Sequence, residues 1–356
     1  MRKSLRLVIV SCALCVACGG STAADPTPDV PPPSPDTASP VPDSTTPQPD
    51  TATPVTTPLY MALTVHLEGW KIGDEALFNK YVAGIREYSD LTHQTDMPFT
   101  WETANLIKGI ELHGDNILLE LQAERGDAVG VHADLGGKVK PGYDQAAFAA
   151  EMAGQKTALE ALGVTVRHVS GICSHLDWVT AALNAGYEAT TATVEYCLKS
   201  LPEDQQPPHV LACDNPGKCH DPYPSDPAEK LHAWRAKDGS TWTTPSDEGL
   251  ILFHSSGALP CLAESAADPG SKTQCEWAQD DVDQAMTHIE TALSLLDPSK
   301  MNQLIFVWSY GQAIDKALLS QLLQSIQVLV DEGKVVWTTL PGMIDHFEAW
   351  EKANTP

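Results

Sequence analysis

Short apolar runs alternate along the chain with longer segments in which apolar residues recur every three or four positions. The short runs predict strands at 62–66, 97–101, 128–132, 165–169, 189–194, 250–254, 304–308 and 335–339. The longer segments predict helices at 75–88, 143–162, 176–185, 282–296, 316–332 and 341–351. Strands that alternate with helices indicate an α/β fold with a parallel sheet. Seven or eight such units favour a (β/α) barrel over an open sheet.

The amino-terminal residues do not follow this pattern. Three basic residues precede an apolar stretch at 7–17, which has the layout of a secretory signal and is too short to span a membrane. The stretch ends in CVACGG at 15–20, which resembles a bacterial lipobox. We therefore expect residues 1–18 to be a lipoprotein signal peptide with lipid attached to Cys18. An ordinary secreted protein that is cleaved nearby is the alternative.

Residues 19–58 are rich in Pro, Thr and Asp and contain 12 of the 27 prolines of the chain. Such a segment cannot bury a core, so we expect a disordered tether between the membrane and a folded domain at 59–356. Gly19 follows Cys18 where an Asp would signal retention in the inner membrane. The expected location is therefore the outer membrane of a Gram-negative bacterium, with the protein exported and lipid-anchored in the cell envelope.

The charge of the chain is strongly negative, with a formal value of −25. This charge argues against nucleic acid as a partner, because a phosphate backbone would be repelled. It does not identify a substrate, and nothing in the sequence predicts the oligomeric state.

Six cysteines lie in the expected domain, and six cysteines in an exported domain suggest three disulfides. Cys213 with Cys219 and Cys261 with Cys275 would each close a loop, which leaves Cys173 for Cys197. A zinc cluster is the alternative, although Cys213 and Cys219 lack the spacing of a zinc knuckle. The proline-rich segment at about 197–247 interrupts the strand–helix rhythm and is interpreted as a disulfide-pinned insertion.

Titratable and hydroxyl side chains follow most of the predicted strands. His66 and Glu68 share a face of the first strand, because alternate residues of a strand point the same way. The residues after the later strands are Glu102, His132, Asp134, Ser170, His175, Glu195, His254, Ser309 and Tyr310. In a parallel barrel these carboxyl ends converge on one mouth. A ring of imidazoles and carboxylates there predicts divalent-metal binding and general acid–base chemistry.

Four segments carry recognisable motifs: LTVHLEG at 63–69, RGDAVGVHAD at 125–134, RHVSG at 167–171 and LFH at 252–254. Together they resemble the polysaccharide deacetylase (NodB-homology) family of carbohydrate esterases, whose fold is a distorted β/α barrel. The first resembles the motif that supplies a catalytic base and a metal ligand, and the second resembles a strand ending in a metal-binding histidine. The third and fourth are similar to the R-x-P-x-G and late L-x-H motifs.

The resemblance implies a role for each residue. Glu68 and His132 would bind a divalent metal, with zinc as the expected ion, and His66 would stand at the position of the catalytic base. His254 would act as general acid toward the leaving group, and Arg167 would orient the group in the base position. Metal-activated water would attack an acetamide or ester carbonyl of an acetylated glycan and release acetate.

The sequence departs from the family pattern at the second motif. The family has another histidine four residues after the first, and this chain has Gly136 there. One of His66, Asp134 or His175 would then complete the metal site.

Two alternatives remain open. The missing histidine is compatible with a catalytically inactive carbohydrate-binding protein. A glycoside hydrolase would instead use two carboxyl groups among Glu68, Glu102 and Glu195. A serine hydrolase is disfavoured, because the chain has no G-x-S-x-G elbow.

Overall fold

The computed structural model describes residues 57–67, 72–136, 143–254, 278–310 and 315–354, which lie in one compact unit, Pro54–Pro356. Its strands are β1 (Leu59–His66), β2 (Thr100–Glu102), β3 (Ala128–His132), β4 (His168–Ser170), β5 (Ala189–Thr190), β6 (Trp234–Ala236), β7 (Leu250–Leu252), β8 (Asn302–Ser309) and β9 (Val335–Trp337). The α-helices are α1 (Glu75–Thr95), α2 (Leu106–His113), α3 (Ile117–Glu124), α4 (Gln145–Glu160), α5 (Trp178–Asn184), α6 (Pro208–Leu211), α7 (Gln279–Ser294), α8 (Lys316–Asp331) and α9 (Leu340–Asn354). Among the described residues, no helix is both long and apolar enough to span a bilayer.

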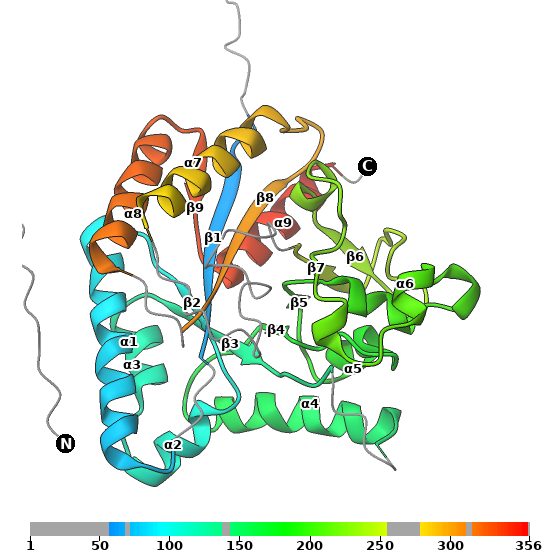
Figure 1. The fold of residues 1–356 in the computed structure, drawn as a ribbon, viewed down its shortest axis with the longest axis horizontal. Coiled ribbons are helices and arrows are strands. Elements are labelled where there is room, and N and C mark those ends of the chain that lie inside the picture. Colours follow the sequence, from blue (N-terminus) through cyan, green and yellow to red (C-terminus); the bar gives the residue numbers. More distant parts are fainter. Residues whose placement is uncertain (1–56, 68–71, 137–142, 255–277, 311–314, 355–356) are drawn as a thin grey trace, which may run out of the picture. The chain divides into compact units, whose positions relative to one another are not determined.

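One curled sheet contains the nine strands (Figure 1): eight follow the order β6-β7-β5-β4-β3-β2-β1-β8, and β9 pairs with β1 beside this path. All pairs are parallel except β6 with β7. The first half of β1 pairs with β9, and its second half pairs with β2. A bridge between His232 and Asn302 links the segment before β6 to the start of β8. The predicted distorted (β/α) barrel is confirmed.

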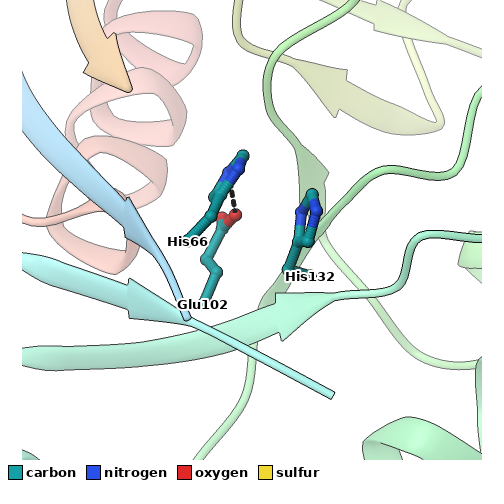
Figure 2. Close-up of side chains that lie close together, drawn as sticks. All are labelled: His66, Glu102 and His132. Carbon is teal, nitrogen blue, oxygen red and sulfur yellow. Dashed lines mark ion pairs between the residues drawn. The ribbon is translucent and has the colours of Figure 1, made fainter. Parts of the chain in front are cut away.

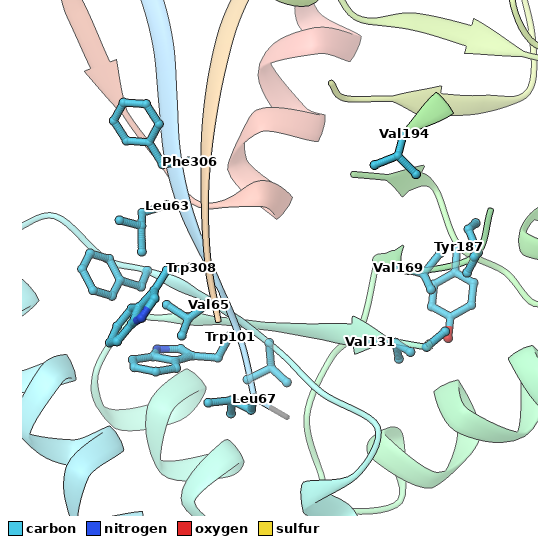
Figure 3. Close-up of a cluster of buried hydrophobic side chains, with 14 of the residues drawn as sticks. Leu63, Val65, Leu67, Trp101, Val131, Val169, Tyr187, Val194, Phe306 and Trp308 are labelled. Atoms are coloured by element: carbon cyan, nitrogen blue, oxygen red, sulfur yellow. The ribbon is translucent and has the colours of Figure 1, made fainter. Parts of the chain in front are cut away.

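Alternation along the strands divides the sheet into two faces. Leu63 and Val65 of β1 lie in a large apolar cluster with Phe306 and Trp308 of β8, on the side that the outer helices cover (Figure 3). Ala62 lies in a second cluster that joins residues of β1, β5, β7 and β8 to α9. Because these strands are not all neighbours, this second cluster fills the concave side of the sheet.

Helix α9 occupies only one end of this concave side. Its contacts involve residues near the amino ends of the strands: the ring of Tyr60 lies 4.6 Å from that of His346, and Leu340 donates its backbone N–H to Thr100 Oγ1. On the same face of β1, Thr64 and His66 follow Ala62 toward the carboxyl end and are fully buried. The sequence therefore places apolar residues under the helix and polar residues beyond it.

Two arginines attach α9 to the sheet. Arg167, just before β4, binds Glu188 with two nitrogens and places Nη1 2.7 Å from Asp345 of α9. Arg235 of β6 forms a similar pair with Glu351. The expected role of Arg167 as the residue that orients the catalytic base therefore needs correction, because its guanidinium is engaged by Glu188 and Asp345 at the amino end of the strand.

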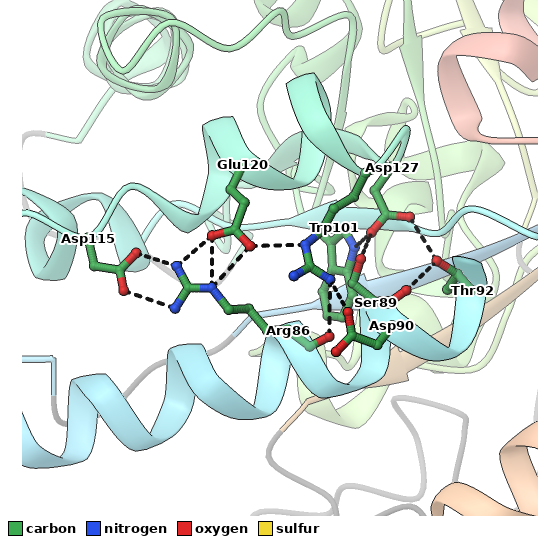
Figure 4. Close-up of polar contacts among 9 residues, drawn as sticks. Arg86, Ser89, Asp90, Thr92, Trp101, Asp115, Glu120 and Asp127 are labelled. Atoms are coloured by element: carbon green, nitrogen blue, oxygen red, sulfur yellow. Dashed lines mark hydrogen bonds and ion pairs between the residues drawn. The ribbon is translucent and has the colours of Figure 1, made fainter. Parts of the chain in front are cut away.

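The outer side of β2 and β3 is fixed by a buried carboxylate, Asp127 (Figure 4). It accepts hydrogen bonds from Ser89 of α1 at 2.7 Å, from the indole of Trp101 at 2.8 Å and from the backbone N–H of Phe99 at 2.9 Å. Burial raises the pKa of Asp127, and these donors oppose the rise. A salt-bridge network around Arg86, with Asp115 and Glu120, lies nearby on the surface.

The segment from Cys197 to Asp247 forms an irregular insertion within the same unit. It begins within the 3-10 helix η1 (Glu195–Ser200), contains α6 and the short 3-10 helices η2 (Glu203–Gln205), η3 (Pro216–Lys218) and η4 (Glu229–Leu231), and adds β6 to the sheet edge. Disulfides join Cys173 to Cys197 and Cys213 to Cys219, as predicted. The third expected pair, Cys261 with Cys275, lies outside the described residues.

Replacing Arg167 tests its structural role. We expect Arg167→Ala to lower the free energy of unfolding by about 1–2 kcal/mol, because partly exposed carboxylates of Glu188 and α9 lose their partner. Urea denaturation measures this change, with Lys218→Ala, which removes an exposed ion pair, as the control. Loss of metal binding without loss of stability would contradict the structural role.

Candidate metal centre

Three side chains meet at the carboxyl ends of the adjacent strands β1, β2 and β3. They are His66, Glu102 and His132, and each offers a ligand atom within 4.8 Å of the others (Figure 2). His66 lies opposite Glu102 in the register of β1 and β2, and both are fully buried. All three point to the concave side, because Val65, Trp101 and Val131 point into the outer cluster. The arrangement thus follows from strand alternation.

Glu102 is the most densely bonded group in this cluster. Its Oε2 lies 3.0 Å from His66 Nε2 and accepts the hydroxyl of Ser170. Its Oε1 lies 3.2 Å from His168 Nε2 and accepts the hydroxyl of Thr191 at 3.3 Å. Burial alone would raise the pKa of Glu102, but His168 and His66 outweigh burial and hold the pKa well below its usual range. Glu102 is therefore a carboxylate at neutral pH.

His132 is connected to this carboxylate through Ser170. Its Nδ1 lies 2.8 Å from Ser170 Oγ, and Ser170 Oγ lies 3.5 Å from His66 Nε2. The rings of His66 and His132 are stacked, with centroids 3.9 Å apart. Ser170, at the end of β4, therefore contacts all three members of the cluster.

A glycine makes room for His168, one of the partners of Glu102. Gly130 lies two residues before His132 on the concave face, and a Cβ built there would overlap the ring of His168. His168 is fully buried and fills the space that a larger residue would occupy. The absence of a side chain at 130 thus allows β4 to place an imidazole against Glu102.

The structure gives a steric reason for a second glycine, Gly136. A Cβ at Gly136 would overlap the carbonyl oxygen of Cys173 and lie close to Pro216. A histidine at this position is therefore excluded sterically by the loop after β4, which the Cys173–Cys197 disulfide holds. Among the described residues, His66 is the second imidazole that lies close to His132.

The three side chains are of the types that bind a divalent metal, and the separations of their ligand atoms are close to those of a metal site. Two imidazoles and one carboxylate are the protein ligands of many catalytic zinc sites, which leave a fourth position open. Ligand atoms about 2.0–2.2 Å from a tetrahedral ion lie roughly 3.5 Å from one another. The observed separations, up to 4.8 Å, require movements of about 1 Å by the side chains.

The other predicted ligands are not members of this group or lie outside the described part of the chain. Glu68 belongs to the latter group, so its role as a ligand stays a prediction. Asp134 and His175 are exposed, and neither belongs to the metal-binding group found among the described residues. Asp134 has a left-handed backbone, with φ of 47°, immediately beyond β3.

The sequence placed Glu102 in the expected ring of strand-end residues and among the glycosidase candidates, but it did not single out Glu102 as a metal ligand. In the structure Thr103 performs the helix-start role, since its Oγ1 accepts the backbone N–H of Leu106. The alternation Thr100-Trp101-Glu102 was the signal that could have identified Glu102. It puts the carboxylate opposite the buried indole, on the same face as His66.

His254 follows β7 and is fully buried, with its ring 4.1 Å from that of Trp234. Thr193 Oγ1 lies 2.7 Å from His254 Nδ1 and donates its only proton to the carbonyl oxygen of Tyr223. The hydroxyl oxygen must therefore accept, so that Nδ1 carries the proton and Nε2 carries a lone pair. Burial lowers the pKa of His254 to about 3, so the ring is neutral at neutral pH. The neutral ring has no proton on Nε2. It must therefore accept a proton there before it can donate one.

Comparison with known proteins supports the fold. No protein-family model and no curated protein sequence matches this chain. A solved structure described as a "putative polysaccharide deacetylase", from Mycobacterium smegmatis, matches 86% of this chain and 94% of its own, with a TM-score of 0.55 and 12% identity. PuuE allantoinase matches 83% of this chain and 92% of its own, with a TM-score of 0.50 and 10% identity. The chain shares their fold.

Substitution of Gly130 tests the packing around Glu102. We expect Gly130→Ala to lower the free energy of unfolding by about 1–3 kcal/mol, because the new methyl group must displace the buried ring of His168. Gly154→Ala is the matched control, since α4 leaves open space there and alanine should stabilise the helix by up to about 1 kcal/mol. Thermal or urea unfolding compares them, and equal effects would refute the packing argument.

The buried imidazole of His254 predicts a pH dependence of stability. Its pKa of about 3 in the folded protein lies below the unfolded value of about 6.5. Between these values only the unfolded chain binds the proton, so stability is lost as the pH falls from about 6.5. In urea titrations, His254→Gln should reduce this slope by up to about 1.4 kcal/mol per pH unit. An unchanged slope would contradict the burial of a neutral ring.

Proposed function

We propose that this protein is a metal-dependent hydrolase that removes acetyl groups from a polysaccharide or related glycan. The observation that carries the proposal is the convergence of His66, Glu102 and His132 at the mouth of a deacetylase-like barrel. The donor set of two imidazoles and one carboxylate favours zinc. The substrate class, an acetylated glycan, is inferred from the resemblance of the four sequence motifs to polysaccharide deacetylases.

In this proposal His66, Glu102 and His132 hold the ion. When bound, a divalent ion supplies Lewis-acid polarisation of the scissile carbonyl and lowers the pKa of an attacking water. Glu102 contributes negative charge, and His168 and Thr191 fix its second oxygen so that the carboxylate keeps its orientation. Both features support hydrolysis of an amide or ester.

His254 can exchange a proton during the reaction. It follows β7, whose carboxyl end lies at the same edge of the parallel sheet as those of β1 to β5. Bound substrate or ion would have to raise the pKa of His254 from about 3 before Nε2 could take up the proton released from water and return it to the leaving amine or hydroxyl. In this order of proton transfers, His254 first accepts a proton and then acts as the general acid that the family resemblance implies.

A glycoside hydrolase is less well supported. The general acid of such an enzyme needs a carboxyl group with a raised pKa, whereas the pKa of Glu102 is held low. Glu195 lies 3.0 Å from the exposed imidazole of His209 at the start of the insertion, and Glu68 lies outside the described residues.

We further propose that the protein works in the cell envelope, exported and lipid-anchored at Cys18. The two disulfides support export, because disulfides persist in oxidising compartments. Residues 1–56, which hold the expected signal peptide and most of the expected tether, lie outside the described residues.

Elemental analysis of the purified chain with its disulfides intact tests the metal site. We expect about one zinc per chain, lost in His66→Ala, Glu102→Gln and His132→Ala, because each substitution removes a ligand. His175→Ala, at an exposed histidine outside the cluster, should keep the metal. Glu68→Ala shows whether this residue is a further ligand.

Acetate release from N-acetylglucosamine oligomers and from O-acetylated xylan then tests the reaction. The same three variants should lose activity, and chelation followed by zinc addition should remove and restore it. A protein that binds no ion would contradict the hydrolase proposal and favour the inactive carbohydrate-binding alternative. New reducing ends without acetate would favour the glycosidase.

A further inference from the structure

Ser170 has three polar contacts within the candidate centre, and its single proton restricts how they can be made. Its Oγ contacts Glu102 Oε2, lies 2.8 Å from His132 Nδ1 and lies 3.5 Å from His66 Nε2. Ser170 is fully buried at the end of β4, so no bulk water can take over any of these contacts.

The direction of each hydrogen bond follows from the donor inventory. A carboxylate only accepts, so the Ser170 proton goes to Glu102. The hydroxyl oxygen must then accept from His132, and the proton of the neutral imidazole is therefore on Nδ1. In that tautomer Nε2 carries the lone pair, which is the form of the ring that ligates a metal through Nε2.

We propose that Ser170 is a positioning residue that fixes the Nδ1–H tautomer of His132 and thereby presents Nε2 to the metal. This inference rests on the proposed function for the identity of what Nε2 binds, but the tautomer itself is a property of the metal-free protein. Groups in the outer shell of a metal site orient its ligands in this way, and their loss typically lowers metal affinity 10–100-fold.

The chain contains a matched control for a Ser170 substitution. Ser89 is also a fully buried serine, and its hydroxyl donates to the carboxylate of Asp127 at 2.7 Å. It contacts the outer side of β3 rather than the centre. Ser89→Ala and Ser170→Ala therefore remove the same kind of hydrogen bond, and only the second removes a partner of His132.

The decisive experiment is long-range proton–nitrogen NMR of the 15N-histidine-labelled, metal-free chain at pH 7. For His132 we expect a pyrrole-like Nδ1 and a pyridine-like Nε2 in the wild type and in Ser89→Ala. Ser170→Ala should shift His132 toward a mixture of tautomers. A wild-type His132 protonated at Nε2, or a tautomer unaffected by Ser170→Ala, would overturn the inference.

Zinc titration against a competing chelator gives an independent readout. We expect Ser170→Ala to bind zinc 10–100-fold more weakly than the wild type, while Ser89→Ala binds as tightly as the wild type. Ser170→Thr, which keeps a hydroxyl donor and acceptor at Cβ, is the conservative variant and should bind zinc about as tightly as the wild type; if the alanine variant does not fold, the wild-type tautomer of His132 still decides. Unchanged affinity in Ser170→Ala would contradict the positioning role.

The two proposals fail separately. If wild-type protein bound no zinc, the proposed function would be refuted, together with the part of this inference that gives Nε2 a metal. If wild-type protein bound zinc but His132 carried its proton on Nε2, the role of Ser170 would be refuted and the hydrolase proposal would stand.

Discussion

A carboxylate buried without compensating donors is costly, and the candidate centre is organised around that constraint. Glu102 is fully buried and is surrounded by two imidazoles and two hydroxyls from β1, β4 and the segment after β5. Glu102 belongs to β2, and none of these partners does. The charge can therefore be stable only when the strands are correctly paired, which couples the integrity of the fold to the formation of the centre.

The concave side of the sheet combines this polar cluster with an apolar region. Helix α9 covers the amino-terminal half, where Ala62 and Ile305 lie, and the polar residues occupy the carboxyl-terminal half. Arg235 of β6 and Arg167, just before β4, attach the helix to the sheet. The helix packs on the apolar region and contributes no residue to the three-member cluster.

Much of the fold could be predicted from the sequence, because strand alternation and helical periodicity record burial directly. The barrel, the two disulfides and the positions of His66 and His132 followed from such local patterns. Helices α2 and α3 were not predicted, because each has only eight residues and their periodicity is brief. β6 was missed because it lies in an irregular, proline-rich insertion and is defined by its antiparallel pairing with β7.

The composition of the centre was harder to predict, because it depends on which strand ends are neighbours. Glu102 has the same local sequence signal as a helix-start residue, and only the register of β1 with β2 brings it opposite His66. Arg167 matched a family motif in sequence, yet the ion pairs of its guanidinium lie at the other end of β4. The steric reason for Gly136 likewise arises from the loop after β4, which is distant in sequence.

The central claim is that His66, Glu102 and His132 form one metal site. The most direct test is the anomalous difference density of crystals soaked in zinc, recorded on both sides of the zinc absorption edge. The account predicts one strong peak within bonding distance of all three side chains. A peak that is bound elsewhere, or no peak at a zinc concentration that saturates the protein in solution, would contradict it.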